Sequence, residues 1–272
     1  MARKKTRPLP RDLNLPPGGA DSHVHLDMGG LAGSLDQVLA RAESCGISHL
    51  GNVFLGPDAY KKGQALFKNH DQVFFILGTH PHDSGAFTTD TAEQITGLCR
   101  TDSRIKAMGE TGLDFFYDYS PADLQKKAFR IQLEAAKQLD LPVVIHSRDA
   151  YPETVAILTD MGFKGRPVLW HCFGQGPEQA REITSFGWHI SIPGSVTYKK
   201  NQSLRDAVKV IGPDRLLLET DCPFLAPEPY RGKENEPAFL GFTALKVAEI
   251  RNTDPAELWL QCGDNCRDFF NI

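Results

Sequence analysis

The sequence predicts a (β/α)8 barrel, also known as a TIM barrel. Three observations predict it: a length of 272 residues, eight short apolar runs that alternate with helix-like segments, and polar residues that follow five of those runs. A chain of this length fits one such barrel. Several runs lack polar alternation, which is typical of parallel strands covered on both faces. We expect strands over residues 21–26, 49–54, 73–78, 105–109, 143–145, 168–170, 188–192 and 216–218.

Segments with helical periodicity lie between these runs. The clearest covers residues 121–139, where Ser120 is a suitable N-cap and Pro121 suits the first helical position. Further helices are predicted over residues 34–45, 154–161 and 255–270. We expect the last of these to pack on the outside of the barrel.

A doubly wound open sheet is the alternative architecture. It is weakened because no glycine-rich dinucleotide loop follows the first strand. No compositional break indicates a second domain, so we expect one domain over residues 21–272, preceded by a flexible extension over residues 1–20. The segment 223–237 is rich in proline and charge, and we expect it to fold over the barrel mouth.

The composition is ordinary for a globular protein, with 41% hydrophobic and 24% charged residues. No apolar stretch approaches the roughly 20 residues needed to span a bilayer. The basic N-terminus lacks a following apolar region and the six cysteines form no CxxC pair, so we expect a cytoplasmic protein with reduced thiols. The net charge of −4 argues against an extended DNA-coating surface, but it allows contact with one chain end.

Six potential metal ligands lie at corresponding positions of five predicted strands. His23 and His25 have the i, i+2 spacing that lets strand residues point to one face. Active sites of such barrels lie at the carboxyl ends of the strands, where all six fall. Imidazoles and carboxylates suit Zn²⁺, Mn²⁺ or, less comfortably, Mg²⁺. The sequence therefore predicts a metal-dependent hydrolase with the ligands His23, His25, Glu110, His146, His171 and Asp221.

Seven motifs follow one another from about residue 20 to the C-terminus. They are DSHVHLD at 21–27, GTHPH at 78–82, GETGLD at 109–114, LPVVIHSRD at 141–149, HCFG at 171–174, LETDCP at 218–223 and PYRGKENEP at 229–237. HxH alone is a weak motif, whereas the ordered series is specific. Through this series the chain resembles the TatD family of metal-dependent hydrolases and deoxyribonucleases.

The resemblance implies two divalent metal ions and leaves room for a third. One ion would be held by His23, His25 and Asp221, and the other by His146 and His171. Glu110 would bridge the two ions, offset their repulsion and, with Asp221, act in catalysis. Such a pair of ions supplies a metal-bound hydroxide as the nucleophile. Asp221 is either the proton acceptor or a plain ligand.

Substrate-binding residues are also expected near the metal ions. His80 and His82 follow the third strand, and the resemblance implies that one or both approach the substrate phosphate, with His82 preferred. Arg148 is expected to bind a phosphate, although it could instead pair with Asp149 or Asp114.

Three other positions lie beside the predicted ligands or in the segment 223–237. We expect Glu219 to hydrogen-bond a ligand rather than bind metal. Strand alternation favours a packing role for Cys172, with a soft metal ligand as the alternative. Arg231, in the segment 223–237, could contact a nucleic-acid backbone.

The resemblance implies a deoxyribonuclease that acts as a 3′–5′ exonuclease. Its expected partner is DNA with single-stranded 3′ ends, and its expected state is a monomer or weak oligomer. Hydrolysis of a small ester, amide or lactone at the same dinuclear site is the alternative. A third alternative is a metal-binding scaffold or nucleic-acid-binding protein without catalysis.

Overall fold

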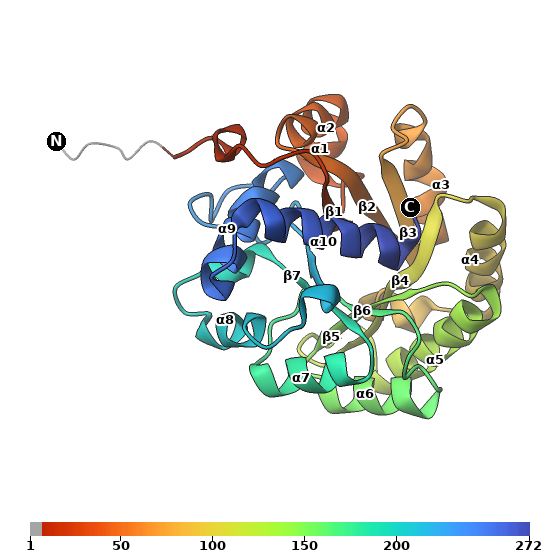
Figure 1. The fold of residues 1–272 in the computed structure, drawn as a ribbon. Helices are drawn as coiled ribbons and strands as arrows, with labels where there is room; N and C mark the ends of the chain where they lie inside the picture. The colour runs from red at the N-terminus through yellow and green to blue at the C-terminus, as the bar shows by residue number, and fades with distance from the viewer. Residues whose placement is uncertain (1–6) are drawn as a thin grey trace.

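The eight predicted strands form one parallel sheet in the structure, a computed structural model that describes residues 7–272. Neighbouring strands in the sequence are neighbours in the sheet, in the order β1 to β8 (Figure 1). The strands are β1 (Gly19–Val24), β2 (Ile47–Leu55), β3 (Val73–Gly78), β4 (Ile105–Asp114), β5 (Val143–Arg148), β6 (Val168–Trp170), β7 (His189–Ile192) and β8 (Leu216–Leu218). Strands β4 and β5 are longer than predicted and contain Glu110 and His146.

The sheet closes where β1 meets the end of β8. Val24 forms a parallel bridge with Cys222, and Ser22 Oγ donates a 3.0 Å hydrogen bond to the carbonyl oxygen of Leu218. The backbone amide of Asp221 donates to the carbonyl oxygen of His23 over 3.0 Å. These contacts confirm the closed barrel and exclude the open doubly wound sheet.

Helices surround the barrel and agree with the predicted ones to within a few residues. They are α1 (Gly29–Ala32), α2 (Leu35–Ser44), α3 (Pro57–Gly63), α4 (Thr89–Thr101), α5 (Ala122–Leu139), α6 (Tyr151–Asp160), α7 (Pro177–Ser185), α8 (Gln202–Val208), α9 (Leu240–Arg251) and α10 (Pro255–Phe270). The cap of α5 differs from the prediction, because Pro121 takes the N-cap position. Ser120 Oγ instead donates to the carbonyl oxygen of His82 over 2.6 Å. No helix in residues 7–272 is long and apolar enough to cross a membrane.

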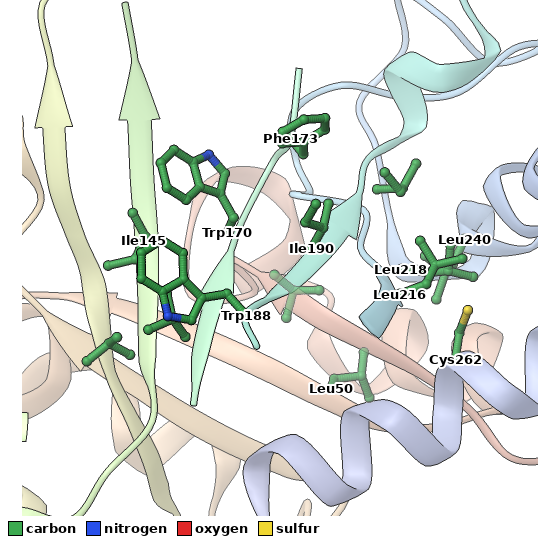
Figure 2. Packing of buried hydrophobic residues seen from close by; sticks show 14 of the residues in the cluster. Leu50, Ile145, Trp170, Phe173, Trp188, Ile190, Leu216, Leu218, Leu240 and Cys262 are labelled. Carbon is green, nitrogen blue, oxygen red and sulfur yellow. The ribbon is translucent and has the colours of Figure 1, made fainter. Parts of the chain in front are cut away.

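An apolar layer between the strands and the surrounding helices forms the larger of two cores. Figure 2 shows part of it, with Trp170 and Trp188 beside β5 and β6. Both indoles are almost fully buried, and Trp188 Nε1 donates a 2.9 Å hydrogen bond to the carbonyl oxygen of Phe163. The burial of large aromatic groups fixes each helix against its strand.

Helix α10 closes the amino-terminal end of the barrel, and this corrects the expectation that it packs on the outside. It lies across the strands in Figure 1. Its Cys266, Phe269 and Phe270 pack with an inner layer of apolar strand residues. A Cβ atom at Gly19 would lie 1.8 Å from the Trp259 ring, so only glycine permits this close approach. The inner layer consists of Ala20, Val53, Phe74, Ile76, Ala107, Val144, Leu169 and Leu217.

The N-terminal segment packs on the barrel where it is described. We expected a flexible extension over residues 1–20, but residues 7–20 contact the C-terminal third of the chain, and residues 1–6 lie outside the described range. Arg7 Nε donates to the carbonyl oxygen of Pro229 over 2.8 Å, and Trp259 Nε1 donates to that of Pro16 over 2.9 Å. A domain boundary after residue 20 would also divide β1, which begins at Gly19.

Candidate metal centre

Glu110 lies at the centre of a cluster of histidines at the carboxyl end of the barrel. Its Oε1 is 2.8 Å from His146 Nδ1 and 3.0 Å from His171 Nε2, and its Oε2 is 3.4 Å from His23 Nε2. The side chain is buried. One carboxylate therefore contacts ligands from three other strands or strand ends, as a bridging ligand would.

Asp221 forms a second part of the cluster with the two N-terminal histidines. Its Oδ1 is 3.4 Å from His25 Nε2 and 3.8 Å from His23 Nε2. His23 thus contacts both carboxylates, and its ring stacks on that of His171 with the centroids 3.7 Å apart. The structure brings all six predicted ligands together, from β1, β4, β5, β6 and β8.

His80 also belongs to the cluster. The sequence predicts a substrate contact for it, but the structure buries it with Nε2 3.5 Å from Glu110 Oε1. The ligand atoms of His80, Glu110 and His146 lie within 4.8 Å of one another. The group that contains His146 therefore includes His80, whereas the sequence analysis paired His146 with His171.

An irregularity in β1 aims His23 into the barrel. Ala20 packs in the inner apolar layer, so strict alternation would direct residue 22, not residue 23, to the same side. The register with β2 shifts between Asp21 and Val24, because the three steps from Asp21 to Val24 match two steps in β2. A bulge of this kind re-aims the side chains that follow it.

Strand β4 uses the same device to aim Glu110. Ala107 packs in the inner layer, and the register with β5 shifts between Met108 and Thr111. Gly109 lies in the shift with φ of +156°, and a Cβ atom there would be 2.7 Å from the carbonyl oxygen of Val144. Only glycine fits this position, since the neighbouring strand leaves no room for a side chain. Glu110 consequently points inward, where alternation alone would turn it outward.

The donor atoms of the cluster fit a metal centre. Both ring nitrogens of His23 and Nδ1 of His25 are buried and have no hydrogen-bond partner among residues 7–272. Buried polar atoms without partners are costly, so they indicate a ligand that completes them. Imidazole and carboxylate donors within 4.8 Å of one another suit a divalent ion.

Two further carboxylates hold the outer nitrogens of the cluster histidines. His171 Nδ1 is 3.3 Å from Glu219 Oε2, and His146 Nε2 is 3.0 Å from Asp114 Oδ2. In both rings the other nitrogen faces Glu110. Metal-binding histidines commonly donate their outer N–H to a carboxylate, which fixes the tautomer and the ring orientation. Glu219 has the hydrogen-bonding place that the sequence predicts.

Asp114 is a site residue that the sequence analysis considered only as a partner for Arg148. Its Oδ2 also lies 2.9 Å from His82 Nε2, and its Oδ1 accepts hydrogen bonds from the backbone amides of Phe116 and Tyr117. Its position four residues after Glu110, at the end of the motif GETGLD, was the available signal. Asp114 thus links two histidines to the loop after β4.

The electrostatics of the cluster keep its carboxylates ionised. Burial raises the pKa of Glu110, but the surrounding histidines, led by His171 and His80, outweigh it and hold that pKa well below its ordinary value. Burial likewise opposes the hydrogen bond from His25 and the nearby His171 and His23, which together lower the pKa of Asp221. Metal binding needs deprotonated carboxylates, so these environments favour it.

A cavity of about 840 Å³ opens onto the cluster. His25, Glu110, His146, His171 and Asp221 line it. Further lining residues without a ligand role in the sequence analysis are Met28, Leu55, Tyr117, Gln175, Ser195, Phe224 and Leu225. Phe224 and Leu225 belong to the segment 223–237, which therefore borders the barrel mouth as expected.

Cys172 also lines this cavity, which corrects its expected packing role. Strand β6 ends at Trp170, and Cys172 has φ of +46°, so strand alternation does not apply there. Its backbone amide donates to Glu219 Oε1 over 2.6 Å. The residue is partly exposed.

Arg148 lies exposed at the cavity wall and makes neither of the ion pairs considered as alternatives. Its guanidinium carbon is 3.7 Å from the centre of the Phe116 ring and 4.8 Å from that of Tyr117. No salt bridge joins it to Asp114 or Asp149 in the described chain. Because the aromatic rings cover only part of the guanidinium, its N–H groups stay available to an anion.

Comparison with known proteins agrees with this geometry. The family model described as TatD related DNase matches residues 20–271. The chain is 34% identical over 252 residues to a protein named uncharacterized metal-dependent hydrolase YabD from Bacillus subtilis, covering 93% of this chain and 98% of that protein. It is also 34% identical over 260 residues to a protein named 3′-5′ ssDNA/RNA exonuclease TatD from Erwinia tasmaniensis, covering 93% of this chain and 99% of that protein.

A solved structure has the same fold. It is that of YJJV, a TatD homologue from Escherichia coli K12, with a TM-score of 0.88 and 26% sequence identity over 93% of this chain and 98% of that one. The fold, the clustered donors and the match of the family model over almost the whole chain agree. The chain therefore belongs to the TatD related DNase family of metal-dependent hydrolases.

Proposed function

We propose that this protein is a 3′–5′ exonuclease that acts on single-stranded DNA with the help of two divalent metal ions. The observation that carries the proposal is the position of Glu110, which contacts His23, His146 and His171 at the carboxyl end of a closed barrel. Several relatives at 32–34% identity bear the name 3′-5′ ssDNA/RNA exonuclease TatD. Both observations support a nuclease at this site.

Each of the two ions would have its own set of ligand residues. His23, His25 and Asp221 would hold one ion, and His146 and His171 the other, with Glu110 between them. His80 would join His146, since its Nε2 is 3.5 Å from Glu110 Oε1. A third ion near the substrate phosphate stays a prediction. When bound, the ions would lower the pKa of water and neutralise phosphate charge.

The side chains around the ions have separate tasks in this proposal. Asp221 is 14% exposed, so it is open to the cavity and can accept the proton that the attacking water loses. His82 is 26% exposed, and Asp114 holds its Nε2 at 2.9 Å, which fixes the ring at the cavity wall, where the substrate phosphate would approach. Arg148 supplies a bidentate contact to a phosphate oxygen pair.

The geometry favours a chain end over an intact duplex. The cavity lies inside the mouth of a closed barrel and holds about 840 Å³, which is in the range of small-molecule sites. A separated strand end can enter it, whereas a duplex would have to unpair first. We also expect the protein to act in the cytoplasm as a monomer or weak oligomer, which stays a prediction.

Labelled oligonucleotides test the proposal. Metal-free enzyme receives Mg²⁺, Mn²⁺ or Zn²⁺ and then single-stranded DNA labelled at the 3′ or the 5′ end, with Glu110→Gln as the inactive control. We expect release of single nucleotides from the 3′ end by the wild type alone. If metal-loaded enzyme cleaves no oligonucleotide but hydrolyses a small ester, amide or lactone, the nuclease proposal is wrong.

A further inference from the structure

Three aromatic side chains of the segment between β4 and α5 are exposed together. Phe116 is 53% exposed, Tyr117 39% and Tyr119 67%. Single exposed apolar residues need no explanation, but a contiguous group of rings indicates a binding surface. We call these three residues, with Arg148, the aromatic platform.

Contacts within the aromatic platform hold it in one arrangement. The rings of Tyr117 and Tyr119 stack with centroids 5.1 Å apart at 18°, and Phe116 meets Tyr117 edge to face at 4.7 Å. Arg148 packs against Phe116 and Tyr117. The backbone amides of Phe116 and Tyr117 are fixed by Asp114 Oδ1 at 3.0 and 3.1 Å. A preformed surface loses little conformational entropy when a ligand binds.

The aromatic platform is continuous with the metal centre. Tyr117 and Arg148 line the same cavity as Glu110. The ring of His82 lies 4.8 Å from that of Tyr119 and 5.5 Å from that of Tyr117. A ligand whose phosphate reached the ions would therefore place its neighbouring groups beside these rings.

We infer that the aromatic platform stacks unpaired nucleobases next to the scissile phosphate. The inference rests on the proposed nuclease function and adds the part of the substrate that this loop recognises. Aromatic rings stack on bases of any sequence, and each such base contributes about 1–3 kcal/mol. In a duplex the base faces are already covered by their neighbours, so the aromatic platform favours single strands without base-specific contacts.

A substrate with missing bases tests the inference. One oligonucleotide carries normal nucleotides at its 3′ end, and a matched one carries abasic spacers at the last three positions. We expect wild-type kcat/KM to be about 5- to 150-fold higher for the normal end, the range that one stacked base gives. Tyr119→Ala should reduce this ratio toward one, while Tyr119→Phe should keep it.

The ratio separates stacking from damage to the fold. A variant that is merely misfolded loses activity on both substrates and keeps the ratio. Leu66→Ala is the matched control, since Leu66 is 43% exposed and lies in the short helix η2 (Gln64–Phe67), outside the cavity lining. It should keep both the activity and the ratio of the wild type.

Each remaining outcome overturns a defined statement. If the wild type cleaves the normal and the abasic oligonucleotide with equal kcat/KM, base stacking by the aromatic platform is refuted and the nuclease function is left intact. No cleavage of either oligonucleotide by metal-loaded wild type refutes both. If Tyr119→Ala keeps the substrate ratio and instead abolishes a concentration-dependent dimer, the aromatic platform is a contact between two copies of this chain.

Discussion

The two ends of the barrel are built from the same eight strands, yet they bury opposite kinds of side chain. At the amino-terminal end the inner layer is apolar and α10 seals it with Phe269 and Phe270. At the carboxyl end the strands bury Glu110 and four histidines. The first end gains free energy of folding by removing apolar surface from water, whereas the second loses it by desolvating charges.

Each end also has a cavity, and the difference between the two shows how a site is made. The cavity at the amino-terminal end is about 790 Å³, close to the other in size, and is lined by residues such as Lys106, Asp214 and Arg215. Among residues 7–272, the groups of side chains that could hold a metal ion include none of its lining residues. At the carboxyl end three overlapping groups of donors occur, and the ligand atoms within each group lie within 4.8 Å of one another. Convergence of donors, rather than cavity size, distinguishes the metal centre.

Loss of the central carboxylate should have the largest effect. Glu110→Gln removes a charge that four histidines contact, so we expect a fall in kcat of at least ~10⁴-fold, as when one member of a cooperating catalytic set is removed. Initial rates with labelled DNA and metal content by mass spectrometry measure it. Glu134→Gln, at an exposed position of α5, should change neither. Full metal content and full activity in Glu110→Gln would contradict the assignment of Glu110 as a metal ligand.

At the other end, a core substitution should affect stability and leave the chemistry unchanged. Trp259 is buried against Gly19, and Trp259→Ala should lower the free energy of unfolding by about 3–5 kcal/mol. Urea unfolding measures the loss, and the neighbouring, partly exposed Leu260→Ala should lose far less. The rate per folded molecule should equal that of the wild type. A matching fall in that rate would show that the two ends are coupled.

Asp114→Asn sharpens the comparison within the carboxyl end. The amide can still accept from the backbone through its oxygen, but its nitrogen is a donor and can accept from neither His82 nor His146. We expect metal affinity or activity to fall about 10- to 100-fold, the usual cost of losing a carboxylate behind a metal ligand. Metal titration by calorimetry measures it. Asp118→Asn, exposed in the same loop, is the control, and equal losses in both variants would contradict the assignment.

The smallest effect concerns His189 at the amino-terminal end. Burial, and then the charge of Arg215, lower its pKa from 6.5 to about 4, and Arg215 Nη1 lies 3.2 Å from its Nε2. The unfolded chain therefore takes up a proton first as the pH falls, so the stabilisation is complete above pH 6.5 and is lost between pH 6.5 and about 4. After allowance for solvent screening we expect about 1–2 kcal/mol.

The His189 prediction is measured as a difference between two proteins. Urea unfolding of the wild type and of His189→Gln at several pH values gives the free energies of unfolding. The gap between them should shrink as the pH falls from 6.5 to 4, because glutamine does not titrate. Titration of the metal-centre histidines occurs in both proteins and cancels. A gap that stays constant over this range would contradict the lowered pKa.

The sequence by itself determined the barrel and most of the metal centre. Uninterrupted apolar runs indicate strands that are buried on both faces. A closed parallel barrel places the carboxyl ends of all these strands together. Glu110, His146 and His171 could therefore be assigned from their positions after three such runs. The family motifs gave the same residues and added the division between two ions.

Tertiary structure alone decided three features. The register shifts in β1 and β4 turn His23 and Glu110 inward, and alternation within one strand does not reveal a bulge that depends on the neighbouring strand. The place of His80 beside Glu110 depends on how the chain turns after β3. The seal formed by α10 depends on contacts with β8 and with β1, which lies more than 200 residues earlier in the chain. Sequence patterns record the burial of each residue, whereas only the folded chain specifies which buried residues meet.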